Sequence, residues 1–194
     1  MGVLDDSLKW LDFRRFEGKK GSSTLQREVD RMLSELKIDP KTLKSVVTVA
    51  GPGFYTGLRL SEGFADVLSF FGIPHFSFFT YQIPVWTGTV QGSWMTKAYR
   101  GEYFFFDWKG GNHTISLIAD SELENHLKQY QGIFVHSEKA LDEKSLALIP
   151  PHIKTIDLLK AHPEKIFGQV LAQKLKFDSY YFRAPEDEFR VAGP

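Results

Sequence analysis

The stretch AGPGFYTGLRLSEGFADVLSFFGIP, from Ala50 to Pro74, indicates the fold of this chain. It follows an apolar run over residues 45–50 that is typical of a buried strand. The glycines and proline at its start favour a tight turn. Apolar residues at helical spacing then predict a helix over residues 57–71, and Gly72 is typical of a helix end. The stretch therefore predicts a strand, a glycine-rich turn and a helix in direct succession.

The turn and the start of this helix combine features of an anion-binding site. Gly51 and Gly53 allow the backbone to pass close to a ligand, and Thr56 is a favourable N-cap residue. Backbone N–H groups at a helix start, here near Gly57, attract negative charge. Arg59 lies in the first helical turn, where the helix dipole disfavours a cation by about 0.3–1 kcal/mol. It therefore needs an anion, which is either a bound ligand or a carboxylate of the chain itself.

Residues 51–59, GPGFYTGLR, resemble the GPGSFTGLR signature of the TsaB (YeaZ) family, and seven of the nine positions match. Members of that family are the non-catalytic partners of a TsaD-like subunit in the bacterial synthesis of threonylcarbamoyladenosine (t6A) in tRNA. The resemblance implies an α/β, actin-like (ASKHA, ribonuclease-H-like) fold of two lobes. It covers nearly the whole chain, strongly over residues 51–74 and weakly elsewhere.

One strand of that family has no counterpart here. TsaB-like chains start with a strand that reads like ILAIDTS and lies at the centre of the first sheet, whereas MGVLDD at residues 1–6 matches the family's second strand. The resemblance therefore predicts a truncated first lobe whose sheet lacks its centre and keeps unpaired edges unless other strands close the gap. We expect a first lobe over residues 1–86 and a second over residues 87–194.

Composition excludes several classes of protein. Basic and acidic residues are equal in number, 24 each, which argues against a dedicated nucleic-acid-binding protein. The chain has no cysteine, so it has neither disulfides nor thiolate chemistry, as is typical of a cytoplasmic protein. No apolar run reaches the roughly 18 residues of a membrane span, and the N-terminus does not resemble a signal peptide. Seventeen phenylalanines suggest that some aromatic surface serves a partner.

Catalytic motifs are missing from the sequence. No two of the six histidines are four residues apart, so a helical metal-binding pair is absent, and there is no Gly-x-Ser-x-Gly elbow and no Walker A lysine. We therefore expect no catalytic residue, metal or cofactor. Two alternatives remain: an enzyme of the same fold, either a phosphotransferase or nucleotide hydrolase that uses the 51–57 loop or a metallopeptidase-like hydrolase, and a degenerate homodimer without a role in modification.

The predicted helix over residues 57–71 has two apolar faces. The broader one is expected to cover the chain's own sheet and comprises Leu60, Phe64, Val67, Leu68 and Phe71. The opposite face, together with a second predicted helix over residues 24–36, is expected to contact a partner through Arg27, Arg31, Leu58, Glu62, Ala65, Asp66 and Ser69. The resemblance implies that this partner is a TsaD-like subunit, or a second copy when the chain is alone. It also implies a TsaE-like ATPase as a further partner and only indirect contact with tRNA.

Overall fold

The computed structural model describes residues 1–15, 22–99 and 101–182, and it shows a mixed α/β chain that divides into two compact units. Unit 1 comprises residues 1–79 and the chain from Phe167 onward, and unit 2 comprises Thr80–Ile166. This division differs from the expected lobes, 1–86 and 87–194, because the last helix returns to unit 1. Phe167 packs edge-on against Trp10 and Phe78, with ring centroids 5.5 and 6.0 Å apart.

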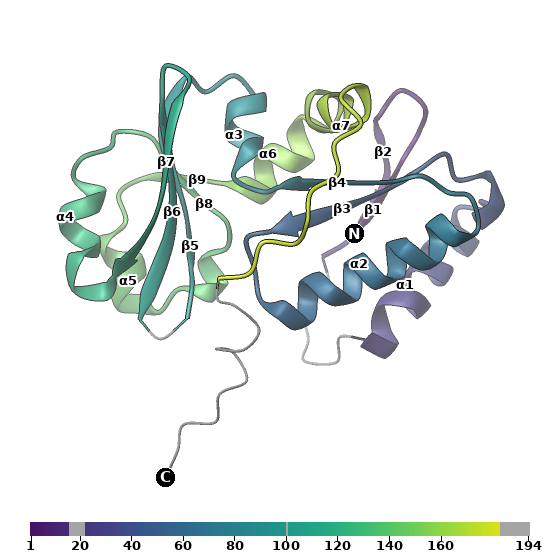
Figure 1. Cartoon of the computed structure of the whole chain (residues 1–194), viewed down its shortest axis with the longest axis horizontal. Coiled ribbons are helices and arrows are strands. Elements are labelled where there is room, and N and C mark those ends of the chain that lie inside the picture. Colours follow the sequence, from purple (N-terminus) through teal and green to yellow (C-terminus); the bar gives the residue numbers. More distant parts are fainter. Residues whose placement is uncertain (16–21, 100, 183–194) are drawn as a thin grey trace, which may run out of the picture. The chain divides into compact units, whose positions relative to one another are not determined.

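Unit 1 contains two separate two-stranded sheets (Figure 1). Its elements are β1 (Gly2–Leu4), β2 (Trp10–Phe13), α1 (Ser22–Glu35), the short 3-10 helix η1 (Pro40–Thr42), β3 (Val46–Gly51), α2 (Tyr55–Phe70) and β4 (His75–Phe79), followed by α7 (Pro163–Ala172), which starts in unit 2. Strands β1 and β2 pair antiparallel, and β3 pairs with β4 in parallel. No described strand joins the two pairs. The predicted gap in the first sheet is therefore present.

The central stretch forms the elements that its sequence predicts. The valine-rich segment of β3 runs over Val46–Gly51, and α2 starts at Tyr55, two residues earlier than expected. Gly72 ends α2 with a φ of +87°, a conformation that glycine adopts without strain. The strand–turn–helix prediction is thus confirmed, with small shifts at the boundaries.

Unit 2 is built on one five-stranded sheet in the order β7-β6-β5-β8-β9. The strands are β5 (Gln91–Lys97), β6 (Glu102–Lys109), β7 (Asn112–Ala119), β8 (Ile133–Val135) and β9 (His152–Lys154). Its helices are α3 (Gln82–Trp86), α4 (Leu123–Leu127), α5 (Glu143–Leu148) and α6 (Thr155–Ala161), with two short 3-10 helices, η2 (Asp120–Glu122) and η3 (Glu138–Ala140). Strands β7, β6 and β5 pair antiparallel, and β8 and β9 continue the sheet in parallel.

Side chains bury the central strands of unit 2 on both faces. Met95, Tyr103 and Phe105 form one core with Leu123 and Leu127 of α4. On the other face Phe104 and Phe106 stack on Tyr81, and the Trp94 Nε1 donates a 2.8 Å hydrogen bond to Thr155 Oγ1. The described strands of unit 2 thus form one continuous sheet, whereas those of unit 1 form two separate pairs.

No helix in the described parts of the chain is both long and apolar enough to cross a membrane. Over the same residues, the histidine and carboxylate side chains form no group of three or more that could hold a metal ion.

Candidate functional site

The turn between β3 and α2 depends on Gly51 more than on Gly53. Gly51 has a φ of +121°, and a Cβ built there would lie 2.5 Å from the carbonyl oxygen of Tyr180. Gly53 has no positive φ, and a Cβ there would make only ordinary contacts of 3.5 Å with Leu58. The expected close approach of the backbone is therefore made by Gly51, and the group that it approaches belongs to the chain itself.

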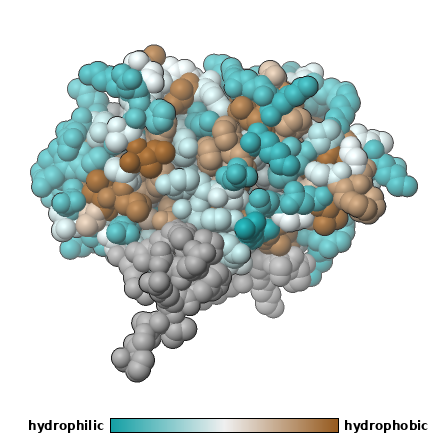
Figure 2. Space-filling model, viewed as in Figure 1, coloured by the Kyte–Doolittle hydropathy of each residue, from teal (hydrophilic) through white to brown (hydrophobic). Residues whose placement is uncertain are grey.

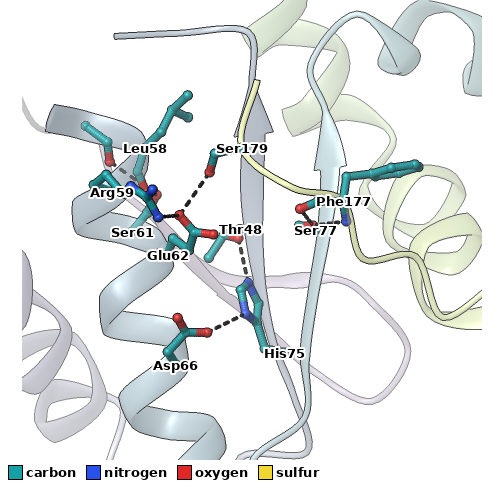
Figure 3. Close-up of polar contacts among 11 residues, drawn as sticks. Thr48, Leu58, Arg59, Ser61, Glu62, Asp66, His75, Ser77, Phe177 and Ser179 are labelled. Carbon is teal, nitrogen blue, oxygen red and sulfur yellow. Dashed lines mark hydrogen bonds and ion pairs between the residues drawn. The ribbon is translucent and has the colours of Figure 1, made fainter. Parts of the chain in front are cut away.

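The segment after α7 covers this turn. Tyr180 donates its backbone N–H to the Ala50 oxygen at 2.7 Å and accepts a 3.3 Å hydrogen bond from the Gly53 N–H. Further back, Ser77 Oγ donates to the Phe177 oxygen at 3.0 Å and accepts from the Phe177 N–H at 2.7 Å (Figure 3). The Gly53 N–H of the predicted anion site is thus already hydrogen-bonded to another residue of unit 1.

The prediction that Thr56 caps the helix is wrong. The N-cap residue is Phe54, whose side chain makes no capping hydrogen bond, and Thr56 lies exposed inside the first turn. The helix can start earlier because Phe54 has the extended backbone of an N-cap residue, φ −74° and ψ 139°. Gly57 has open space where a Cβ would be, so nothing in the described structure requires a glycine there.

Arg59 is paired with a carboxylate of the chain itself. Its Nη1 donates to Glu62 Oε2 at 3.1 Å, one helical turn further on, and Ser179 Oγ donates to the same oxygen at 3.2 Å (Figure 3). The guanidinium also lies 5.6 Å from the ring centre of Tyr55 and 5.7 Å from that of Tyr181, within the range of a cation–π contact. Of the two anions that the sequence left open, the structure shows the internal carboxylate.

A second polar group links α2 to both strands. The Nε2 of His75 on β4 lies 2.8 Å from Thr48 Oγ1 on β3, and its Nδ1 lies 3.6 Å from Asp66 Oδ1 (Figure 3). The histidine side chain is only 4% exposed. Burial, with a smaller effect from nearby Lys176, lowers the pKa of His75 below its ordinary value, which favours the neutral imidazole.

The predicted assignment of the two α2 faces is wrong. Leu58 and Ala65, expected on a partner-facing surface, are buried within unit 1. Val67, Phe70 and Phe71 are instead 56%, 88% and 74% exposed. Figure 2 shows apolar side chains gathered at the surface over the C-terminal part of α2, at the right of the view. We call these three residues the α2 apolar patch.

The other predicted interface residues differ in exposure. Arg27 and Arg31 of α1 are exposed, and Arg31 pairs with Glu35 at 2.8 Å. Asp66 is exposed, Glu62 is half-buried beside Arg59, and the hydroxyl oxygen of Ser69 is buried. Because Leu58 and Ala65 are buried within unit 1, the role in contacting a partner stays a prediction for the other five residues.

Comparisons with known proteins agree on the fold. Residues 18–74 match the family model of TsaD, tRNA N6-adenosine threonylcarbamoyltransferase. YeaZ from Pseudomonas aeruginosa superposes with a TM-score of 0.53 at 14% identity, over 87% of this chain and 89% of that one. The chain has the YeaZ fold. A second crystal structure, an uncharacterized Pseudomonas aeruginosa protein with similarity to peptidase YeaZ, gives 0.52 at 16% identity over 81% and 83%. No curated protein sequence matches the chain.

These comparisons confirm the predicted fold class, and residues 18–74 include the GPGFYTGLR turn and all of α2. Sequence reasoning missed Ser179 and Tyr180, because no local pattern connects them to their partners Glu62 and Gly53, which lie more than 110 residues earlier. It also missed the α2 apolar patch, for which the large number of phenylalanines was the available signal.

Proposed function

We propose that this chain is a non-catalytic partner subunit of a TsaD-type transferase in the synthesis of t6A in tRNA. Three observations support it: the YeaZ fold, the match of residues 18–74 to TsaD, and the GPGFYTGLR turn. The observation that carries it furthest is the α2 apolar patch, because it lies within the matched segment and presents a surface typical of a protein partner.

The α2 apolar patch is suited to docking another chain. Phe70 and Phe71 meet edge to face at 5.7 Å, and together with Val67 they expose large apolar side chains at the end of one helix. Burying such side chains contributes about 25 cal/mol for each Å² of apolar surface removed from water. We propose that the patch contacts a second copy of the chain when it is alone and the TsaD-type subunit when that is present. A TsaE-like ATPase would join the complex, and tRNA would be contacted only through these partners.

The test is a double variant, Phe70→Asp with Phe71→Asp. Two charges in a desolvated contact should weaken binding to a purified TsaD-type transferase at least tenfold in titration calorimetry, and should convert a homodimer to monomers in light scattering. Phe54→Asp is the control, since Phe54 is also an exposed phenylalanine, 54% exposed, but lies at the other end of the helix, and it should leave both measurements unchanged. Equal loss in the control, or none in the double variant, would place the contact elsewhere.

The proposed absence of catalysis has a test of its own. The Gly53 N–H and the Arg59 guanidinium are engaged by Tyr180 and Glu62, which supports a structural role for the turn. We expect the pure protein to hydrolyse neither ATP nor peptides in the presence of divalent metal ions. Metal-dependent turnover that disappears in Arg59→Ala or His75→Ala would favour the enzyme alternatives.

A further inference from the structure

A hollow in unit 2 lies between two segments, the loop from α3 to β5 and the turn of the β6–β7 hairpin. Its volume is about 360 Å³, within the range of about 300–1,000 Å³ that is typical of small-molecule sites. The residues that line it fall between Val85 and His113, so it is built within one compact unit. We call it the unit 2 hollow.

Hydrogen bonds join the two walls of the unit 2 hollow. Trp108 Nε1 of β6 donates to the Thr89 oxygen at 3.0 Å, and the Gly110 N–H of the hairpin turn donates to the Val90 oxygen at 3.3 Å. Gly110 and Gly111 have φ values of +56° and +88°, as a tight two-residue hairpin turn requires. Because both walls are held in place without a ligand, binding costs little ordering of the chain.

Aromatic rings form part of the lining. The Phe106 ring stacks on Tyr81, with ring centroids 4.4 Å apart and planes 18° apart. The rings of Trp108 and His113 lie 5.7 and 5.3 Å from that of Phe106, and each is inclined to it by 30° or less. A flat ring that enters the hollow can therefore lie parallel to this set, in the offset arrangement that aromatic pairs prefer.

The polar groups of the unit 2 hollow are few and uncharged. None of the described residues that line it is Asp, Glu, Lys or Arg. The side chains of Asn112 and His113 are exposed, and neither forms a hydrogen bond with another described residue. Both are therefore available to a ligand, and the Asn112 amide can donate as well as accept. A charged ligand would lose hydration without gaining an ionic partner, so the lining favours a neutral one.

We propose that the unit 2 hollow binds a small, uncharged aromatic molecule, whose ring lies along Phe106 and His113 and whose polar edge is hydrogen-bonded by Asn112. Val85 and Val90, which also line the hollow and are 40% and 79% exposed, would lose contact with water on binding. The site does not include the α2 apolar patch, so the inference is independent of the proposed function.

Three probes with one skeleton test the chemistry of this site. Benzamide is neutral and aromatic, benzoate replaces its amide with a charged carboxylate, and cyclohexanecarboxamide replaces its flat ring with an aliphatic one. In ¹H–¹⁵N NMR titrations of the full chain at pH 7.5, benzamide should shift the amides of Val90, Gly111 and Asn112 with a Kd of about 1 mM or below. The other two probes should bind at least fivefold more weakly. Absence of these shifts with benzamide, or equal binding of either other probe, would overturn the inference.

Two variants with matched controls locate the bound ring. Asn112→Ala removes the polar contact and should weaken benzamide binding at least threefold, whereas Asn125→Ala, at an exposed asparagine of α4 outside the hollow, should not. Val90→Glu places a charge in the hollow and should weaken binding at least tenfold, whereas Ile153→Glu, at an exposed position of β9, should bind as the parent does. Normal binding by both hollow variants would contradict the proposed site. If Val90→Glu did not fold, Asn112→Ala and the three probes would still decide.

Discussion

The sheet of unit 2 and the sheets of unit 1 differ in how far their strands are paired and buried. In unit 2, β6 has a neighbour on each side along its whole length, and its Phe104 and Phe105 are buried on opposite faces. In unit 1, β3 pairs with a single strand, β4, among the described residues, and its first four residues are all only partly buried. Two-stranded sheets are marginal by themselves in water.

This difference shows that unit 1 depends on other elements for its stability. Helix α2 packs on β3 and buries its own Leu58 and Ala65, and the segment after α7 closes the end of the strand through Tyr180. We therefore expect unit 1 to respond strongly to changes at these contacts, and unit 2 to respond to changes in its own core. If so, the two units should unfold independently of each other. Four variants or conditions test this independence, in order of decreasing effect.

Ala65→Arg should unfold unit 1 and leave unit 2 folded. The side chain of Ala65 is fully buried, so the variant adds an unpaired buried charge, at about 3–5 kcal/mol, and overpacking, at about 1–3 kcal/mol. Hydrogen exchange read by mass spectrometry would report each unit separately. Val67→Arg, at an exposed position of the same helix, should remain within about 0.5 kcal/mol of the parent. Loss of protection in both units at once would mean that they unfold as one.

Phe105→Ala should destabilise unit 2 and leave unit 1 unchanged. Phe105 is fully buried in the core of unit 2, and its truncation should cost about 3–5 kcal/mol of unfolding free energy. In urea titrations followed by exchange, the transition of unit 2 should move to lower urea while that of unit 1 stays in place. A shift of equal size in unit 1 would contradict the independence of the two units.

Gly51→Ala should destabilise the end of β3 by about 1–3 kcal/mol. The new Cβ would combine a positive φ with a 2.5 Å approach to the Tyr180 oxygen, so the covering segment would have to move. Thermal melting would show the loss, and amides near Tyr180 should exchange faster. Gly57→Ala adds the same methyl group in open space and should melt no lower than the parent.

Acidification should weaken unit 1 modestly through His75. Its pKa is lowered in the folded state, so the unfolded chain binds more protons, and stability falls as pH drops below the ordinary histidine pKa of about 6.5. Measuring unfolding free energy between pH 7.5 and 5 should show this slope in the parent and a smaller slope in His75→Gln. His113→Gln, at an exposed histidine of unit 2, should keep the slope of the parent.

Local pattern predicted the elements of the central stretch but not the face of α2 that is buried. Helical periodicity favoured the large residues Leu60, Phe64 and Phe71 as the inner face, because summed hydrophobicity ignores how closely a helix approaches a sheet. In the structure the buried side chains of α2 are instead the small Ala65 and, two helical turns earlier, Leu58. The two described strands beneath α2 form too narrow a sheet to cover its larger side chains.

The candidate site was predictable only in part for a related reason. The need of Arg59 for an anion followed from its place in the helix, but Glu62 was recognised as that anion only in the structure. The contacts of Ser179 and Tyr180 join segments more than a hundred residues apart, which no sequence window contains. The gap in the first sheet, in contrast, was predicted from the resemblance to TsaB-like chains, because residues 1–6 match the second strand of that family.

The return of the chain to unit 1 after Ile166 has a consequence for the order of events on the ribosome. Unit 2 is one continuous segment, Thr80–Ile166, and can fold as soon as it has emerged. Unit 1 cannot be completed before Phe167 and Tyr180 have been synthesised. Tyr180 comes more than 120 residues after Gly53, its hydrogen-bond partner. At roughly 5–20 residues per second, the end of β3 would lack its covering segment for roughly 6–25 seconds during synthesis. The half of the protein that is made first is therefore the half that is finished last.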